Sequence, residues 1–246
     1  MNVFTVGKAT QGYANYLKAH FATPSVAIAY DSRINSRLFA ETAAGVFAAN
    51  GIRVHIYPRL MPTPSLSFAV RDLRSCGGVV ITASHNPAKY NGYKVYGADG
   101  CQITTEAASA IQQEIDRIDP FADVHTLDFA EGLASGIIAY IGEDTVERYL
   151  AAVSAASLLP EDVSRSASIV YTPLNGTGIS CVPRCLRAHG FANITIPPEQ
   201  AEPDGTFPTC PYPNPEIREA LSVGLRLAEK TGSELLLATD PDCDRV

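Results

Sequence analysis

Three aspartates at alternate positions occur in the stretch DPDCDR. Asp240, Asp242 and Asp244 directly follow the apolar run ELLLAT, which is typical of a buried strand. In an extended loop alternate side chains point the same way, so the three carboxylates can converge. Carboxylates that lie so near to one another repel unless a cation lies among them. Oxygen ligands select a hard ion such as Mg²⁺ or Ca²⁺. The stretch therefore predicts a metal site more strongly than a solvated acidic turn.

An EF-hand loop is the alternative metal site with this aspartate spacing. Such a loop requires Gly at its sixth position and Glu at its twelfth. Arg245 occupies the sixth position here, and the sequence reaches only Val246. The guanidinium of Arg245 has a planar fork that suits phosphate oxygens. The pattern favours a site at which a metal ion and a phosphate group meet.

A second polar loop follows another apolar run, in VVITASHNPAKYNGYK. The strand is expected to end near Thr82, and Ser84 lies at the tip of the turn that follows. The G-x-S-x-G turn of hydrolases is absent, and neighbouring residues such as Ser84 and His85 often point apart. A serine that carries phosphate and faces the bound metal fits better, with Lys94 able to reach the same cleft. A plain turn serine and a strand-edge lysine are the alternatives from composition alone.

Alternating short apolar and longer amphipathic segments must position these loops. Strands are predicted at 25–30, 52–57, 77–82, 167–172, 192–197 and 234–239, and helices at 36–51, 104–118, 179–188 and 214–232. This order predicts βαβ units and mostly parallel sheets. We therefore expect two α/β domains, residues 1–140 and 141–246. Each polar loop then lies at the carboxyl end of a strand, where open α/β sheets bind ligands.

The last predicted helix has start and stop signals of its own. Asn214 can cap it, Pro215 suits its first turn and Gly232 ends it. Apolar residues at helical spacing predict its buried face. They are Ile217, Leu221 and Leu225.

Composition narrows the class of protein. The 246 residues are 46% hydrophobic and 18% charged, with a net charge of −7 and no basic stripe. This argues against nucleic-acid and anionic-membrane partners. No apolar run approaches the roughly 20 residues of a membrane helix, and no secretory signal is evident. Six cysteines without a C-x-x-C pair predict buried free thiols and a cytoplasmic location.

TASHNPAKYNGYKVY and DPDCDR together resemble the α-D-phosphohexomutases, the phosphoglucomutase and phosphomannomutase superfamily. AYDSR and TPLNGTG match further family segments, although Gly176 and Thr177 in the latter fit either a structural turn or an anion site. VGKATQGYANYL and PEQAEPDGTFPTCPYPNPE are similar to the phosphoglucomutase 2 and phosphopentomutase branch. The resemblance implies two tandem three-layer α/β domains with mixed, mostly parallel sheets. Residues 1–140 would be domain I with an incomplete N-terminus, and residues 141–246 domain II, ending at the metal loop.

The resemblance also implies roles for individual side chains. Catalysis would use Ser84 as the phosphoserine, His85 to orient the sugar and Lys94 as general acid or base. The ligands of one Mg²⁺ would be Ser84, Asp240, Asp242 and Asp244. Phosphate would contact Arg33 and Arg245.

The activity implied is phosphoryl transfer between sugar 1- and 6-phosphates, or pentose 1- and 5-phosphates. It would proceed through phosphorylated Ser84 and a bisphosphate, with a sugar 1,6-bisphosphate as activator. The family's N-terminal G-T-x-G-x-R-G-like segment and its third and fourth domains are not matched, so we expect a partial site without full turnover. Phosphomannomutase or phosphoglucosamine mutase specificity, or a non-catalytic metal-binding homologue, are the alternatives. The preferred sugar and the oligomeric state stay open.

Overall fold

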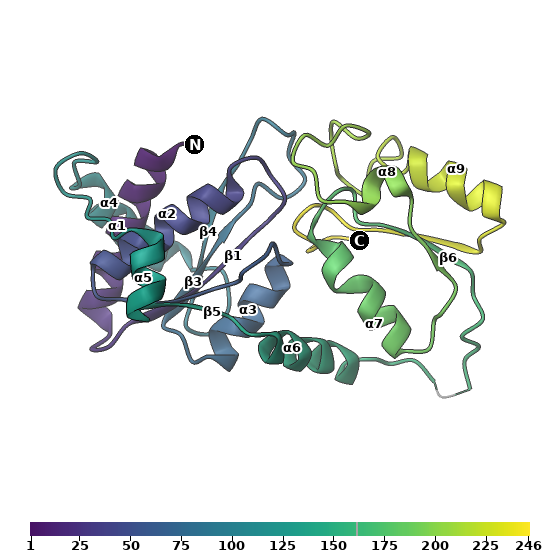
Figure 1. The fold of residues 1–246 in the computed structure, drawn as a ribbon, viewed down its shortest axis with the longest axis horizontal. Coiled ribbons are helices and arrows are strands. Elements are labelled where there is room, and N and C mark those ends of the chain that lie inside the picture. The colour runs from purple at the N-terminus through teal and green to yellow at the C-terminus, as the bar shows by residue number, and fades with distance from the viewer. Residues whose placement is uncertain (161) are drawn as a thin grey trace.

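A computed structural model describes residues 1–160, here the first half, and residues 162–246, the second half (Figure 1). A five-stranded sheet of order β4-β3-β1-β2-β5 organises the first half. Its strands are β1 (Ser25–Tyr30), β2 (Arg53–Ile56), β3 (Gly77–Ile81), β4 (Tyr93–Gly97) and β5 (Ile138–Tyr140). Only β4 runs antiparallel to its neighbour in this sheet, so the sheet is mixed and mostly parallel.

Helices cover both faces of this sheet. They are α1 (Val3–His20), α2 (Ser36–Ala49), α3 (Thr63–Asp72), α4 (Thr105–Asp116), α5 (Phe129–Ser135) and α6 (Glu143–Ala155). Val26 and Ile28 of β1 pack with α1 and α2 on one face, whereas Ala27 and Ala29 pack with α3 and α6 on the other. Alternate strand residues point to opposite faces, so β1 is buried on both sides, as an inner strand of a three-layer domain must be.

The second half has a smaller parallel sheet of order β7-β6-β8. Its elements are β6 (Ile169–Thr172), the 3₁₀ helix η1 (Thr177–Ser180), α7 (Val182–Ala188), β7 (Ile194–Thr195), α8 (Pro198–Ala201), α9 (Ser222–Thr231) and β8 (Leu235–Ala238). Figure 1 shows α8 and α9 on one side of this sheet and α7 on the other. The predicted α/β class with mixed, mostly parallel sheets is confirmed. The division at residue 140 stays a prediction.

The predicted start of the last helix is wrong. Residues 215–221 form turns closed by bonds such as Ala220 N–H to Ile217 O (3.0 Å), and α9 begins only at Ser222. Ala220 is buried with Leu174 and Cys210, and this packing holds the preceding segment in tight turns. Val223 and Gly224 are the buried residues of α9, whereas Ile217 is 36% exposed. Tertiary packing therefore overrode the helical periodicity.

Helix α6 lies along the junction of the two halves (Figure 1). Its Arg148 pairs with Asp72 of α3 at 2.7 Å, and its Glu143 pairs with Arg184 of α7, also at 2.7 Å. Exposed pairs of this kind contribute at most about 1 kcal/mol each. Buried contacts across the junction, such as Cys181 in the cluster that contains Met61, therefore carry more of the packing.

Two further expectations concern the cysteines and membrane-spanning helices. In the described residues all six cysteines are free thiols, but only Cys181 and Cys210 are buried, whereas Cys101 is exposed and the other three are partly buried. Over residues 1–160 and 162–246, none of the helices combines the length and the apolar character that crossing a bilayer requires.

Candidate active site

The loops after β1 and β3 lie side by side at the carboxyl edge of the first sheet, joined by hydrogen bonds from Arg33 to the loop after β3. Strand β1 lies between β2 and β3, and the chain leaves it toward β2 before returning on its other side at β3. In open α/β sheets such a reversal of strand order marks the edge at which ligands bind. The two loops at this edge are residues 31–35 after β1 and residues 82–92 after β3.

Ser84 occupies the tip of the loop after β3. Its φ of 51° is in the left-handed region, which non-glycine residues adopt mainly where the surroundings enforce it. The Ser84 N–H donates to Thr82 Oγ1 at 2.9 Å, and its Oγ lies 3.2 Å from His85 Nδ1. The expectation that these neighbours often point apart therefore does not apply here. Most importantly, Ser84 Oγ donates to Asp240 Oδ2 of the second half at 2.9 Å.

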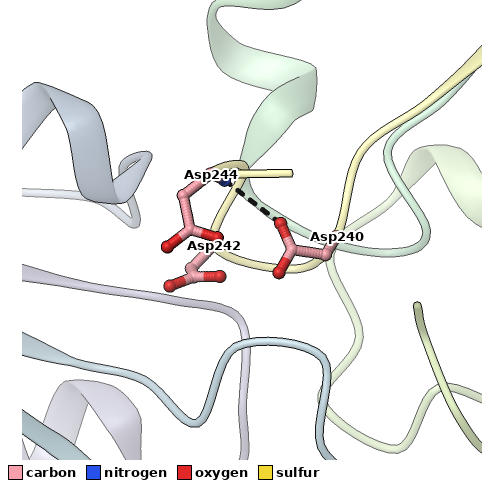
Figure 2. A group of neighbouring side chains, drawn as sticks. All are labelled: Asp240, Asp242 and Asp244. Atoms are coloured by element: carbon pink, nitrogen blue, oxygen red, sulfur yellow. Dashed lines mark hydrogen bonds between the residues drawn. The ribbon is translucent and has the colours of Figure 1, made fainter. Parts of the chain in front are cut away.

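The three aspartates converge on one loop after β8, as predicted (Figure 2). The loop is a tight turn rather than the extended segment expected, because the Cys243 N–H donates to Asp240 O at 2.9 Å and Cys243 has a φ of 56°. One oxygen from each of Asp240, Asp242 and Asp244 lies within 4.8 Å of the others. Asp240 and Asp242 are fully buried, whereas Asp244 is exposed. The backbone N–H groups of Asp244 and Arg245 both donate to Asp240 Oδ1 at 3.1 Å, which holds the loop closed around the carboxylates.

These residues fit a hard divalent cation. Asp242 Oδ1 is buried and has no hydrogen-bond partner among the described residues, which is costly for an acceptor that nothing coordinates. Burial, followed by the charges of Asp242 and Asp244, raises the pKa of Asp240 to about 7. Both features are expected where a bound cation supplies the missing positive charge. An all-oxygen donor set suits Mg²⁺ or Ca²⁺ rather than a soft metal.

Lys94 reaches the acidic loop from β4, which runs antiparallel to β3 and so begins beside the Ser84 loop. Its Nζ lies 2.9 Å from Asp242 Oδ2 and 3.3 Å from Asp244 Oδ2. Burial lowers the pKa of Lys94, but the two carboxylates outweigh this effect and raise it above its ordinary value. The group is therefore a cation and a proton donor at neutral pH.

Lys94→Met is expected to destabilise the protein in buffer without divalent cations by about 2 kcal/mol, because it leaves the buried charge of Asp242 without its ammonium partner. Urea unfolding measures the change, and Lys230→Met on the exposed face of α9 is the control. Added Mg²⁺ should shrink the difference from wild type. Equal losses with and without Mg²⁺ would contradict the placement of Lys94 beside the cation site.

The two predicted phosphate ligands have different surroundings. Arg245 is exposed, and its Nη1 lies 3.2 Å from Glu216 Oε1, so its guanidinium is accessible to solvent. Arg33 is buried, with 3% of its surface exposed, and its guanidinium donates to carbonyls of the Ser84 loop. The structure thus brings most of the predicted site residues to the junction of the two halves: Ser84, His85, Lys94, Arg245 and the three aspartates. Arg33 is buried beneath the Ser84 loop.

Thr63 holds the acidic loop from the first half and was missed in the sequence. As the first residue of α3, it donates its N–H to Asp242 O and its Oγ1 to Asp242 Oδ2, both at 2.8 Å. Pro64 in the first turn is a helix-start signal that would have located α3. The partner of Thr63, however, lies 179 residues away in the chain.

The LNGTG turn, residues 174–178 of the second half, is hydrogen-bonded to the acidic loop and packs closely on it. Thr177 donates its N–H to Pro241 O at 2.8 Å. A Cβ on Gly176 would lie 2.4 Å from Pro241 Cα, so this close approach requires glycine. Of the two interpretations of this turn, the geometry supports the structural one.

Comparison with known proteins agrees with this geometry. Residues 1–121 match the family described as phosphoglucomutase/phosphomannomutase, alpha/beta/alpha domain I, and residues 147–246 match domain II. A Staphylococcus saprophyticus phosphoglucomutase is 39% identical over 246 residues, and a Saccharomyces cerevisiae phosphoribomutase is 38% identical over 260. Both alignments cover all of this chain but only 44% and 42% of the relatives, so the chain spans less than half of their length.

A solved structure has the same fold over nearly the whole chain. It is that of a candidate phosphomannomutase from Thermus thermophilus, with a TM-score of 0.84 and 27% identity. The match covers 99% of this chain and 52% of that one. The chain belongs to the phosphoglucomutase/phosphomannomutase family, of which it contains domains I and II.

Proposed function

We propose that this chain carries the phosphoryl-transfer half of a phosphosugar mutase, an isomerase that works through a phosphoserine. The contact of 2.9 Å between Ser84 Oγ and Asp240 Oδ2 supports this proposal most directly. It joins a hydroxyl of the first half to the acidic loop of the second, across 156 residues of sequence. Phosphoryl transfer needs such a nucleophile beside concentrated positive charge, since its catalysis is mainly positioning and electrostatic stabilisation.

All of the predicted side chains except Arg33 have a direct role in this proposal. Ser84 accepts and donates the phosphoryl group, and its Oγ with Asp240, Asp242 and Asp244 would hold one Mg²⁺. When bound, that ion would neutralise charge on the phosphoryl oxygens. Arg245 contributes an accessible guanidinium for the same oxygens.

The covalent step balances on the residues of the chain. Ser84 Oγ attacks a phosphorus atom of a sugar bisphosphate, so that the Oγ–P bond forms and the P–O bond to the sugar breaks. The proton leaves Ser84 toward Asp240 Oδ2, to which the hydroxyl donates at 2.9 Å, while His85 Nδ1 at 3.2 Å orients the hydroxyl. Lys94, held as a cation by Asp242 and Asp244, donates a proton to the departing sugar oxygen. The reverse sequence transfers the phosphoryl group to the other hydroxyl of a sugar monophosphate.

The substrate class follows from the names of the relatives, a phosphoglucomutase and a phosphoribomutase. We propose a phosphorylated hexose or pentose as substrate and a sugar 1,6-bisphosphate as activator. Domains I and II would supply the phosphoryl donor and the metal site, and full turnover would need the remaining length that the relatives have.

Intact-mass measurement tests the proposal. With Mg²⁺ and glucose 1,6-bisphosphate, the chain is expected to gain one phosphoryl group of about 80 Da. Peptide fragmentation should locate it on Ser84, and a sugar monophosphate should remove it. A chain that gains no mass, or gains it on another residue, would refute the role given to Ser84.

A further inference from the structure

The guanidinium of Arg33 has no N–H group to spare for a phosphate. Its Nη1 donates to Pro87 O and Tyr90 O, both at 3.0 Å. Its Nη2 donates to Ser84 O at 2.5 Å and to Asn86 O in a shorter contact. Its Nε forms an ion pair with Asp31 Oδ2 at 3.2 Å. Four of the five N–H groups of the arginine are thus given to backbone carbonyls, and the fifth faces a carboxylate.

These bonds shape the loop that carries Ser84. Four carbonyls between residues 84 and 90 turn inward to one buried cation, which a loop of this length would otherwise leave to water. With its own carbonyl held by Arg33, Ser84 keeps its left-handed φ of 51° and directs its Oγ at Asp240. The conformation of the proposed nucleophile therefore depends on Arg33.

The face of the Arg33 guanidinium is covered by the second half of the chain. The ring centroid of Phe207 lies 5.1 Å from Arg33 Cζ, a cation–π distance, and Phe207 is 1% exposed. Two residues earlier, Gly205 packs so closely on the loop after β1 that a Cβ there would lie 2.4 Å from Ile34 N. Residues 205 and 207 thus pack on the loop after β1, which carries Arg33.

The turn around Asp204 sets the position of Phe207. Phe207 donates its N–H to Asp204 O at 3.1 Å, and its φ of 47° is left-handed, as is common where packing enforces a conformation. Asp204 in turn donates its N–H to Asn175 O at 3.0 Å, within the LNGTG turn that clasps the acidic loop. One continuous set of contacts therefore joins the acidic loop, Phe207, Arg33 and the Ser84 loop.

We propose that Arg33 and Phe207 are positioning residues: Arg33 folds the Ser84 loop, and Phe207 from the second half holds Arg33 in place. This role replaces the phosphate contact that the family resemblance implied for Arg33. Docking of the two halves then organises the nucleophile and brings it to the acidic loop in the same event. The inference rests on the proposed function for its effect on phosphoryl transfer, but not for its effect on the loop.

Phe207→Leu tests the inference, because it keeps an apolar side chain but removes the ring face. Amide hydrogen exchange should become about tenfold faster in residues 83–91, the size expected for losing a buried cation–π contact. The reporters are the N–H groups of Asn86 and Tyr90, which donate to Ala83 O and Pro87 O within the loop. Phosphoryl uptake by Ser84 should slow by a similar factor. Phe121→Leu, at a ring that is 78% exposed, is the matched control.

Two further comparisons distinguish a positioning role of Phe207 from a general loss of stability: a variant that should restore the contact, and the place in the chain where exchange becomes faster. Phe207→Trp retains a π face and should restore slow exchange in the loop, and Arg33→Lys should speed exchange even more than Phe207→Leu. Exchange in β1, β3 and β6 should stay unchanged in Phe207→Leu. Unchanged exchange in residues 83–91, or equal acceleration throughout the protein, would overturn the inference. Faster loop exchange in a protein whose wild type takes up no phosphate would support it and refute the proposed function instead.

Discussion

Ser84→Ala is expected to abolish phosphoryl uptake from a sugar bisphosphate, slowing it by at least about 1,000-fold, because no other group replaces a lost nucleophile. Ser84 Oγ contacts both Asp240 at 2.9 Å and His85 at 3.2 Å, and the variant removes that single atom. The measurement is intact mass against time with glucose 1,6-bisphosphate and Mg²⁺. Ser109→Ala on the exposed face of α4 should take up phosphate at the wild-type rate.

A second variant controls for a change in the backbone conformation of the Ser84 loop. Ser84 has a φ of 51°, which glycine adopts without strain, so Ser84→Gly should keep the backbone of the loop while removing the hydroxyl. Both variants should retain the thermal unfolding temperature of the wild type to within a few degrees. Uptake of phosphate by either variant would show that another residue is the acceptor.

Asp242→Asn is expected to weaken Mg²⁺ binding by at least about 100-fold, since even residues that only support metal ligands cost 10- to 100-fold when changed. Asp242 is fully buried, and its Oδ1 has no hydrogen-bond partner within residues 1–160 and 162–246, so this atom is the one most in need of a cation. Asparagine keeps the shape of the side chain but removes the charge. Calorimetric titration with Mg²⁺ measures the affinity directly.

The same variant should lose the stabilisation that Mg²⁺ provides. At a concentration 100 times the dissociation constant, a ligand that binds only the folded state adds about 2.7 kcal/mol to the free energy of unfolding. Wild type should show this gain, and so should Asp116→Asn on the exposed surface of α4. If Asp242→Asn binds Mg²⁺ within threefold of wild type, the acidic loop is not the metal site.

The sequence determined the local chemistry because that chemistry depends on spacing. Three aspartates within five residues lie close together in either an extended loop or a tight turn, and Asp240, Asp242 and Asp244 converge in a tight turn. The predicted strands are all present with boundaries shifted by a few residues, since buried apolar runs have few alternative structures. Helices α1, α3, α5, α6 and α8 and strands β4 and β5 were not predicted, although Pro64 is a local start signal for α3. The predicted start of α9 was wrong because contacts such as those of Ala220 with Leu174 are invisible in a local pattern.

Tertiary structure alone decided which of these residues meet. Contacts of Ser84 with Asp240, Lys94 with Asp242 and Thr63 with Asp242 each join positions about 150 residues or more apart. It also decided that Arg33 turns its guanidinium to the Ser84 loop and its face to Phe207, whereas its place in AYDSR indicated a phosphate ligand. Residue type sets what a side chain can bind, but only the packing of the two sheets and their loops against each other sets which partner comes within reach.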